Sequence, residues 1–313
     1  MHDKNLAFAT PADATTRQRW LVFSPLARII TFTAMMIALS FPTHMIVAGL
    51  GWTKAGTPVQ HALGTLSLQL VPVLIAYLVL VRLIERRPMC ELALRSIPTF
   101  GIAGLVSGAV LFSVVVAVLW LLGSYHVTGT RADVAWLPAV LVAGIGAGIG
   151  EEVVTRGVLF RITEEGLGTW SALAISAVFF GAMHIFNPGA TVWSSVAIAI
   201  EAGLLLALIY HVTRSLWACI GLHAAWNIMQ GTVYGIPVSG GAAEGWLISN
   251  RTGPDWLSGG LFGAEASVVA LLTCSIVTLA LLIVAFRRKS IVAPAWVRRR
   301  ATLQEANNTI ATR

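Results

Sequence analysis

Charged residues are scarce in this chain. Asp, Glu, Lys and Arg make up 11% of its 313 residues, whereas soluble domains carry roughly 25%. Hydrophobic residues make up 57%, and the mean hydropathy is +0.79. This composition excludes an ordinary soluble domain, so estimating the number of domains from length does not apply.

Cysteine is also scarce, and a cleavable signal is missing. The three cysteines, Cys90, Cys219 and Cys274, are far apart and form no C-x-x-C, which indicates neither a disulfide framework nor a cysteine metal site. The first 27 residues lack the basic-then-apolar run of a signal peptide, so we expect the first apolar segment to stay as an anchor. The net charge of +7 does not indicate nucleic-acid binding, because the basic residues gather at the ends of apolar segments.

Long apolar segments are the dominant feature of the sequence. A helix needs about 20 apolar residues to cross the hydrocarbon core of a membrane. Eight segments qualify: 29–50, 62–81, 98–123, 136–160, 170–186, 192–210, 216–234 and 266–286. We therefore predict an all-α fold, a polytopic transmembrane helix bundle of about eight spans within residues 28–290.

Basic residues predict the orientation of these spans. With both termini cytoplasmic, 18 of the 21 lysines and arginines lie on inside segments and three lie outside, as the positive-inside rule requires. Residues 1–27 and 291–313 then become cytoplasmic tails, with disorder expected over 1–27 and 301–313. The basic C-terminal tail is expected to contact an anionic leaflet. Residues 235–265 form an external glycine-rich loop, either a solvent loop or a lid over the bundle.

The fourth apolar segment contains an unusual charged motif, Glu151-Glu152-Val153-Val154-Thr155-Arg156. A charged side chain inside a membrane helix costs about 2.5–3.5 kcal/mol on insertion scales, and such groups pair with each other or take part in chemistry. Glu152 and Arg156 are four residues apart on one helix face, in the order that favours an ion pair. Glu151 projects about 100° away. We expect Glu151 to face a cavity; a structural ion network of all three residues is the alternative.

Two further motifs place polar groups on other spans. Phe180-Gly181-Ala182-Met183-His184 ends the fifth, and His223 and Asn227 share one face of the seventh. Each could be a core or helix-packing group. At a rise of ~1.5 Å per residue, however, Glu151 lies ~15 Å and His223 ~13 Å from the basic ends of their spans, and His184 ~21 Å from the start of its own. This shared depth predicts one site.

Two chemical schemes use these residues. In one, a desolvated glutamate activates water, one histidine orients that water, and a second histidine and an asparagine amide stabilise the oxyanion. In the other, Glu151, His184 and His223 bind a divalent metal such as zinc, with water at the fourth position. The absence of H-E-x-x-H excludes the familiar helical zinc motif. The sequence leaves open whether a metal is bound at all.

Functions without catalysis also use buried charges. Membrane carboxylates and histidines are typical of proton relays, so a proton-coupled transporter is an alternative, although we see no internal repeat of the kind many transporters show. A toxin-immunity or binding protein is another. Glu201 lies at a similar depth, but no motif supports it, so we do not assign it to the site.

The three motifs together resemble those of the CPBP intramembrane proteases. That family includes CAAX endopeptidases and bacterial relatives linked to bacteriocin self-immunity, and its pattern is E-E-x-x-x-R, F-x-x-x-H and H-x-x-x-N. Arg156-Gly157-Val158-Leu159-Phe160 and the loop segment Pro237-Val238-Ser239-Gly240 are similar too. The resemblance covers about residues 130–290, with the catalytic core at 130–232. Thr155 departs from it, because the family often has an aromatic residue there.

The resemblance implies an intramembrane endopeptidase in a membrane we expect to be the bacterial cytoplasmic membrane. It implies that Glu151 and His184 activate water, that His223 and Asn227 stabilise the oxyanion, and that Glu152 and Arg156 support them. It implies a membrane-protein or lipidated-peptide substrate and no nucleic acid. Because the family has been described both as metalloproteases and as glutamate proteases, the metal question stays open.

Overall fold

The computed structural model describes residues 6–53 and 56–311, most of which are helical. The α-helices are α1 (Thr16–Leu21), α2 (Pro25–Gly49), α3 (Pro58–Val79), α4 (Ile102–Leu121), α5 (Trp136–Ala139), α6 (Ala147–Glu152), α7 (Arg161–His184), α8 (Val192–Ile198), α9 (Leu205–Thr213), α10 (Leu216–Asn227), α11 (Asp255–Ser258), α12 (Val268–Arg287) and α13 (Ala295–Ala311). Between them lie the π-helical segments η1 (Leu80–Ile84), η4 (Ile97–Gly101), η5 (Val140–Gly146), η6 (Val153–Phe160), η7 (Ala199–Leu204) and η8 (Ile228–Val233), and the 3-10 turns η2 (Cys90–Leu92), η3 (Leu94–Ser96) and η9 (Ala264–Ala266).

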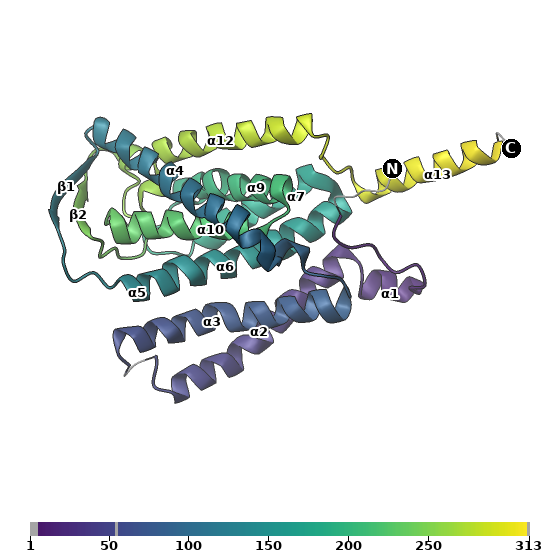
Figure 1. Cartoon of the computed structure of the whole chain (residues 1–313), viewed down its shortest axis with the longest axis horizontal. Helices are drawn as coiled ribbons and strands as arrows, with labels where there is room; N and C mark the ends of the chain where they lie inside the picture. Colours follow the sequence, from purple (N-terminus) through teal and green to yellow (C-terminus); the bar gives the residue numbers. More distant parts are fainter. Residues whose placement is uncertain (1–5, 54–55, 312–313) are drawn as a thin grey trace.

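Helix α10 lies in the middle of the bundle, among α4, α6 and α9 (Figure 1). Its closest neighbour is α4, which presents Gly104 and Gly108. A Cβ on these glycines would lie 2.4 Å from the carbonyl oxygen of Ala218 and 2.3 Å from that of Leu222. Such contact between backbones is how small residues pack helices in a membrane, where hydrophobic burial supplies no force between them. Helices α2 and α3 form a separate hairpin along one side (Figure 1).

Six helical runs among the described residues are long and apolar enough to cross a membrane. The fourth and fifth expected spans form one run of 49 residues, Trp136–His184, but Gly168 breaks it with a non-helical backbone at φ 82° and ψ 171°. The seventh expected span is α10 with η8, in which His223, Asn227 and Gln230 lower the mean hydropathy. It is not among the six. The chain is thus a multi-pass membrane protein, whereas the count of eight and the orientation stay predictions.

The outward faces of the bundle are apolar. Ile37 and Phe41 on α2, Val110 on α4 and Ile276 on α12 are each more than half exposed. Water-soluble proteins cover such faces with polar side chains, and lipid accepts them without cost. The surface therefore supports the membrane assignment independently of helix length.

The all-α expectation misses one small sheet. Strand β1 (Tyr125–Thr130) pairs antiparallel with β2 (Leu247–Arg251), with an irregularity in the register between Val127 and Gly129. The two strands lie at the end of the bundle opposite α13 (Figure 1). Their pairing ties the long 235–265 loop to the connection that follows α4.

The basic end of the bundle contains a buried group of ion pairs, here called the ion-pair cluster: Arg28, Glu85, Arg87, Glu91, Arg161 and Glu165. Arg28 contacts Glu85 and Glu165 at 2.7 Å each, and so joins α2 to α7. Arg161 contacts the same two carboxylates at 3.0 and 3.2 Å. Arg87 contacts Glu85 and Glu91 at 2.7 Å each.

The two tails are less irregular than expected. Helix α1 lies within 1–27, and α13 occupies most of 291–313 and projects from the bundle (Figure 1). The expectation of disorder is therefore wrong for these helices. A capping box at Thr15 begins α1, since Gln18 supplies both of its reciprocal bonds. Residues 1–5 and 312–313 of the tails lie outside the described residues.

Candidate active site

Glu152 and Arg156 form the ion pair predicted from their spacing. Arg156 Nη1 lies 2.8 Å from Glu152 Oε1, and both side chains are completely buried. The other guanidinium nitrogen of Arg156 donates to the carbonyl oxygens of Ala202 and Gly203 at 3.0 and 3.1 Å. These carbonyls belong to the π-helix η7, so Arg156 holds that helix against the motif that contains Glu152.

The same glutamate joins the first motif to the third. His223 Nδ1 on α10 lies 2.9 Å from Glu152 Oε1. Because a carboxylate only accepts, Nδ1 carries the hydrogen of this bond. The position of His223 Nε2 in the cavity is thereby fixed through Glu152.

His184 is oriented by its own helix. Its Nδ1 donates to the carbonyl oxygen of Phe180, 2.7 Å away, because a carbonyl can only accept. The neutral ring then keeps a lone pair on Nε2. Phe180 packs against the His184 ring at 4.6 Å between centroids, and the Arg156 guanidinium lies 4.7 Å from the centroid on Phe180. The first and second motifs therefore share one stack.

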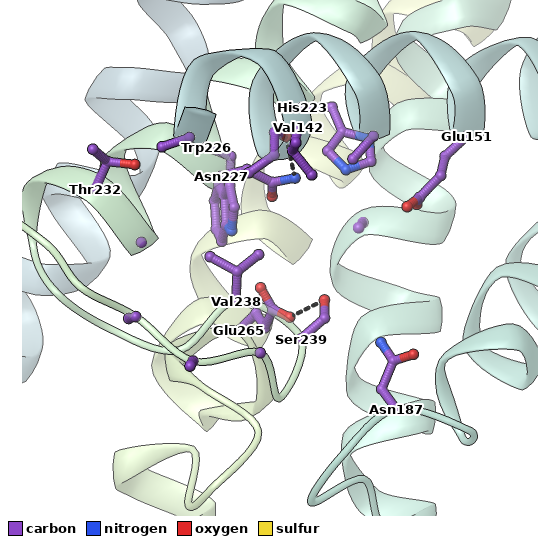
Figure 2. A pocket seen from close by; sticks show the side chains of 18 of the residues that line it. Val142, Glu151, Asn187, His223, Trp226, Asn227, Thr232, Val238, Ser239 and Glu265 are labelled. Carbon is purple, nitrogen blue, oxygen red and sulfur yellow. Dashed lines mark hydrogen bonds between the residues drawn. The ribbon is translucent and has the colours of Figure 1, made fainter. Parts of the chain in front are cut away.

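Asn227 retains unused hydrogen-bonding capacity. Its Nδ2 donates one hydrogen to the carbonyl oxygen of Ala143 at 3.0 Å. An amide nitrogen carries two hydrogens, so one remains for another acceptor. The side chain is mostly buried and lines the cavity beside His223 (Figure 2).

Glu151 is the member of the motif without a partner. Within the described residues its carboxylate has no hydrogen bond and no salt bridge, and Figure 2 shows it pointing into a hollow toward which His223 and Asn227 also turn. Its backbone is held by Thr155, which donates to the Glu151 carbonyl at 2.5 Å and accepts from Arg156 at 2.9 Å. Thr155, where the resembled family often has an aromatic residue, thus connects the ion pair to the backbone of Glu151.

One cavity of about 670 Å³ holds the four predicted catalytic residues, Glu151, His184, His223 and Asn227, on its lining. Three π-helical segments contribute to its lining: η5 with Val142 and Ala143, η7 with Glu201, and η8 with Gly231 and Thr232. π-helical turns within α-helices occur frequently at functional sites. The structure therefore brings all three motifs to one place, while the catalytic roles of the four residues stay predictions.

The 235–265 loop forms one wall of the cavity, which the three motifs did not predict. Ser239 and Glu265 line the cavity across from Asn227, and Ser239 Oγ donates to Glu265 at 2.5 Å (Figure 2). Two features of the sequence pointed to this loop: the interpretation of residues 235–265 as a lid, and the similarity of the loop to bacterial members of the resembled family. Glu201, which the sequence left unassigned, lines the same cavity.

The predicted metal set does not form a metal site as arranged. Across residues 6–53 and 56–311, no group of three or more His, Cys, Asp or Glu side chains is placed to hold a metal ion. Glu151, His184 and His223 face one cavity without converging on a single point. We therefore derive no chemical step through a metal.

Comparison with known proteins supports the family resemblance that the three motifs indicate. The family model for Type II CAAX prenyl endopeptidase Rce1-like proteins matches residues 133–229. That segment contains all three motifs, and the match confirms the family resemblance predicted from them. No curated protein and no solved structure matches the chain. The matched family is a family of proteases.

Proposed function

We propose that this protein is an intramembrane endopeptidase that hydrolyses a peptide bond of a membrane-associated or lipidated protein or peptide. The observation that carries the proposal is the partnerless carboxylate of Glu151, which faces the cavity shared by His184, His223 and Asn227. A carboxylate on the cavity wall that is spared from ion pairing is free to exchange a proton with substrate or water.

The first step is attack by water. Glu151 accepts a proton from water while the water oxygen bonds to the scissile carbonyl carbon. His184 Nε2 is left as an acceptor by the bond of Nδ1 to Phe180. It accepts a hydrogen bond from the second O–H of the water and so orients the water, and that hydrogen stays on the oxygen. Glu151 then gives its proton to the amide nitrogen as the carbon–nitrogen bond breaks.

The negative charge on the former carbonyl oxygen needs donors already in place. The second amide hydrogen of Asn227 is one. The other is Nε2–H of His223 when that ring carries both protons, a form in which Glu152 still accepts from Nδ1. Arg156 balances the charge of Glu152 and supports the position of His184 through Phe180.

A second cavity supports an apolar substrate. It measures about 380 Å³ and lies on another side of Glu151. Met36, Val73, Phe179 and Met183 give it an apolar lining. A lipid chain or apolar helix of a substrate fits such a surface, because it can exchange contacts with lipid for van der Waals packing against these side chains.

Purified protein in lipid nanodiscs, offered lipidated and membrane-embedded peptides, tests the proposal. We expect cleavage by the wild type and by Asp133→Asn, which removes an exposed carboxylate outside the cavity lining. Glu151→Gln and His184→Ala should each lose at least 100-fold in kcat/KM. Cleavage that survives both substitutions would overturn the assigned roles. Proton-coupled uptake into liposomes without proteolysis would favour the transporter alternative.

A further inference from the structure

Two more buried carboxylates face the candidate active-site cavity, and the proposed reaction uses neither. Glu201 on η7 is 2% exposed and Glu265 on η9 is 3% exposed. Glu265 accepts a hydrogen bond from Ser239, whereas Glu201 has no hydrogen-bond or salt-bridge partner in the part of the chain that the structure describes. The carboxylates of Glu201 and Glu265 lie close enough to interact electrostatically.

The cavity as a whole is acidic. Glu151, Glu201, Glu244 and Glu265 line it, and none of the described residues on its lining is lysine or arginine. Of these four, Glu244 is exposed and pairs with Arg131 at 3.6 Å, so the carboxylates without a guanidinium are the other three. Elsewhere in the molecule a buried carboxylate has a guanidinium within 4 Å, as Glu85 and Glu152 do. Burying an ionised carboxylate without a partner is unfavourable by several kcal/mol, so groups left in this state need a proton or a cation from outside.

Two simpler explanations do not fit these residues. Helix packing would give Glu201 a donor on a neighbouring helix, and the described residues supply none. A resident metal would need a third carboxylate, cysteine or histidine ligand beside the two glutamates, and no such group is found across the described chain. The cavity side is where the Glu201 carboxylate can still find a partner.

The loop that presents Glu265 is built to a fixed position. Gly263 has φ +127°, and a Cβ there would lie 2.1 Å from the carbonyl oxygen of Pro237. Gly240 N donates to the Phe262 carbonyl at 2.7 Å, and Trp193 Nε1 on α8 donates to the Ala266 carbonyl at 2.8 Å. Only glycine accepts both the backbone angle and the close contact at 263. Glu265 is therefore held against the cavity rather than left on a solvent loop.

We propose that Glu201 and Glu265 form a subsite that binds one positively charged group of the peptide substrate, next to the bond that is cleaved. An arginine or lysine side chain and a free amino terminus are the two sources of that charge. The proposal rests on the proposed peptidase function and adds the substrate feature that the enzyme selects. Burial raises the pKa of Glu265, with the Ser239 hydrogen bond opposing it, so a cation bound beside this carboxylate would stabilise its charged form.

Matched peptides test the subsite. One series carries arginine, or its neutral isostere citrulline, at single positions on either side of the scissile bond. A second series has a free or an acetylated amino terminus. We expect the wild type to prefer the charged member of one series by at least tenfold in kcat/KM. Glu201→Gln and Glu265→Gln should each reduce that preference to less than threefold, whereas Asp133→Asn, outside the cavity lining, should keep it.

Two results would contradict the proposed subsite. Equal cleavage of charged and neutral peptides by the wild type would overturn the subsite. So would a Glu201→Gln or Glu265→Gln variant that loses both members of a pair equally, because the residue would then act on the reaction or the fold. Glu265→Gln, on a separate element, serves if Glu201→Gln does not fold.

Binding separates this proposal from the peptidase function. Fluorescence anisotropy on Glu151→Gln protein measures peptide affinity without cleavage. The proposed subsite predicts that the charged peptide binds at least tenfold more tightly than its neutral partner, and that Glu201→Gln in this background removes the difference. That result holds even if no peptide is cleaved by the wild type, whereas equal affinities would reject the subsite alone.

Discussion

Carboxylate groups have opposite surroundings in the ion-pair cluster and in the cavity. In the ion-pair cluster Glu85, Glu91 and Glu165 each contact at least one guanidinium at 2.7 Å. In the cavity Glu151, Glu201 and Glu265 contact none within the described residues. Glu201 and Glu265 are as buried as the carboxylates of the ion-pair cluster, and Glu151 is partly buried, so burial alone does not distinguish the two regions. The difference lies in whether the protein itself supplies the opposite charge.

This difference separates structural from functional charge. Removing one partner of a buried pair leaves an uncompensated ion, so a paired carboxylate is committed to the fold. A carboxylate without a partner forms no ion pair that its removal could break, so its substitution changes the chemistry of the cavity instead of the stability of the fold. Glu152 stands between the two cases, since it pairs with Arg156 and also contacts His223.

The largest effect is expected where an unpaired carboxylate is neutralised. Glu151→Gln should reduce kcat/KM by ~10²–10⁴, the usual range for a lost general base. Its free energy of unfolding should change by less than ~0.5 kcal/mol, as for a substitution that breaks no pair. Peptide cleavage and denaturant unfolding in detergent measure the two quantities. A variant that loses stability instead of activity would remove the distinction between the regions.

The converse substitution addresses the ion-pair cluster. Glu85→Ala removes the one carboxylate that Arg28, Arg87 and Arg161 all contact, which leaves an excess of buried positive charge and should cost ~3–5 kcal/mol in the free energy of unfolding. Glu244→Ala is the matched control, because Glu244 also pairs with an arginine but is 79% exposed. That variant should cost less than ~1 kcal/mol. Equal losses from the two would show that burial of the pair is unimportant.

Acid should weaken the ion-pair cluster by a smaller amount, since it removes charge and no atoms. Burial raises the pKa of Glu85, but Arg161, Arg28 and Arg87 outweigh it and leave that pKa below the ordinary value. The pKa of Glu91 is likewise lowered, by Arg87 against the effect of burial. The stability that these groups add is present above the unfolded pKa of ~4.3 and is lost as the pH falls through the lower folded values.

The measurement is the free energy of unfolding in detergent between pH 7 and pH 3. We expect it to fall on the acid side of about pH 4.3, and to fall less steeply in Glu85→Gln, which cannot take up a proton there. A slope unchanged by Glu85→Gln would mean that other carboxylates control acid unfolding.

Local geometry explains which parts of the site the sequence predicted. The Glu152–Arg156 pair follows from four-residue spacing on one helix, and the common depth of three motifs follows from helix rise. Those relations need no knowledge of how the helices pack. The contact of His223 with Glu152 was not predicted, because it depends on α10 packing beside α6.

Long-range contacts explain what the sequence did not show. Arg28 and Glu165 are 137 residues apart, and their ion pair exists only after α2 has met α7. Strand β1 is a short polar segment whose partner β2 comes more than a hundred residues later. Glu265 appeared to be the end of an external loop, and only the glycine contacts that fold this loop inward place it in the cavity.

The smallest expected effect concerns metal. Because Glu151, His184 and His223 do not converge into a metal-binding group in the described structure, the comparison between paired and unpaired carboxylates predicts that a substrate cation, not a resident one, balances the cavity. Dialysis against a chelator should leave kcat/KM within twofold, and elemental analysis of the purified protein should find less than stoichiometric zinc. Asp133→Asn, treated identically, controls for loss during dialysis. Activity that disappears with the chelator and returns with zinc would instead place Glu151 among the paired carboxylates, with a metal ion as its partner.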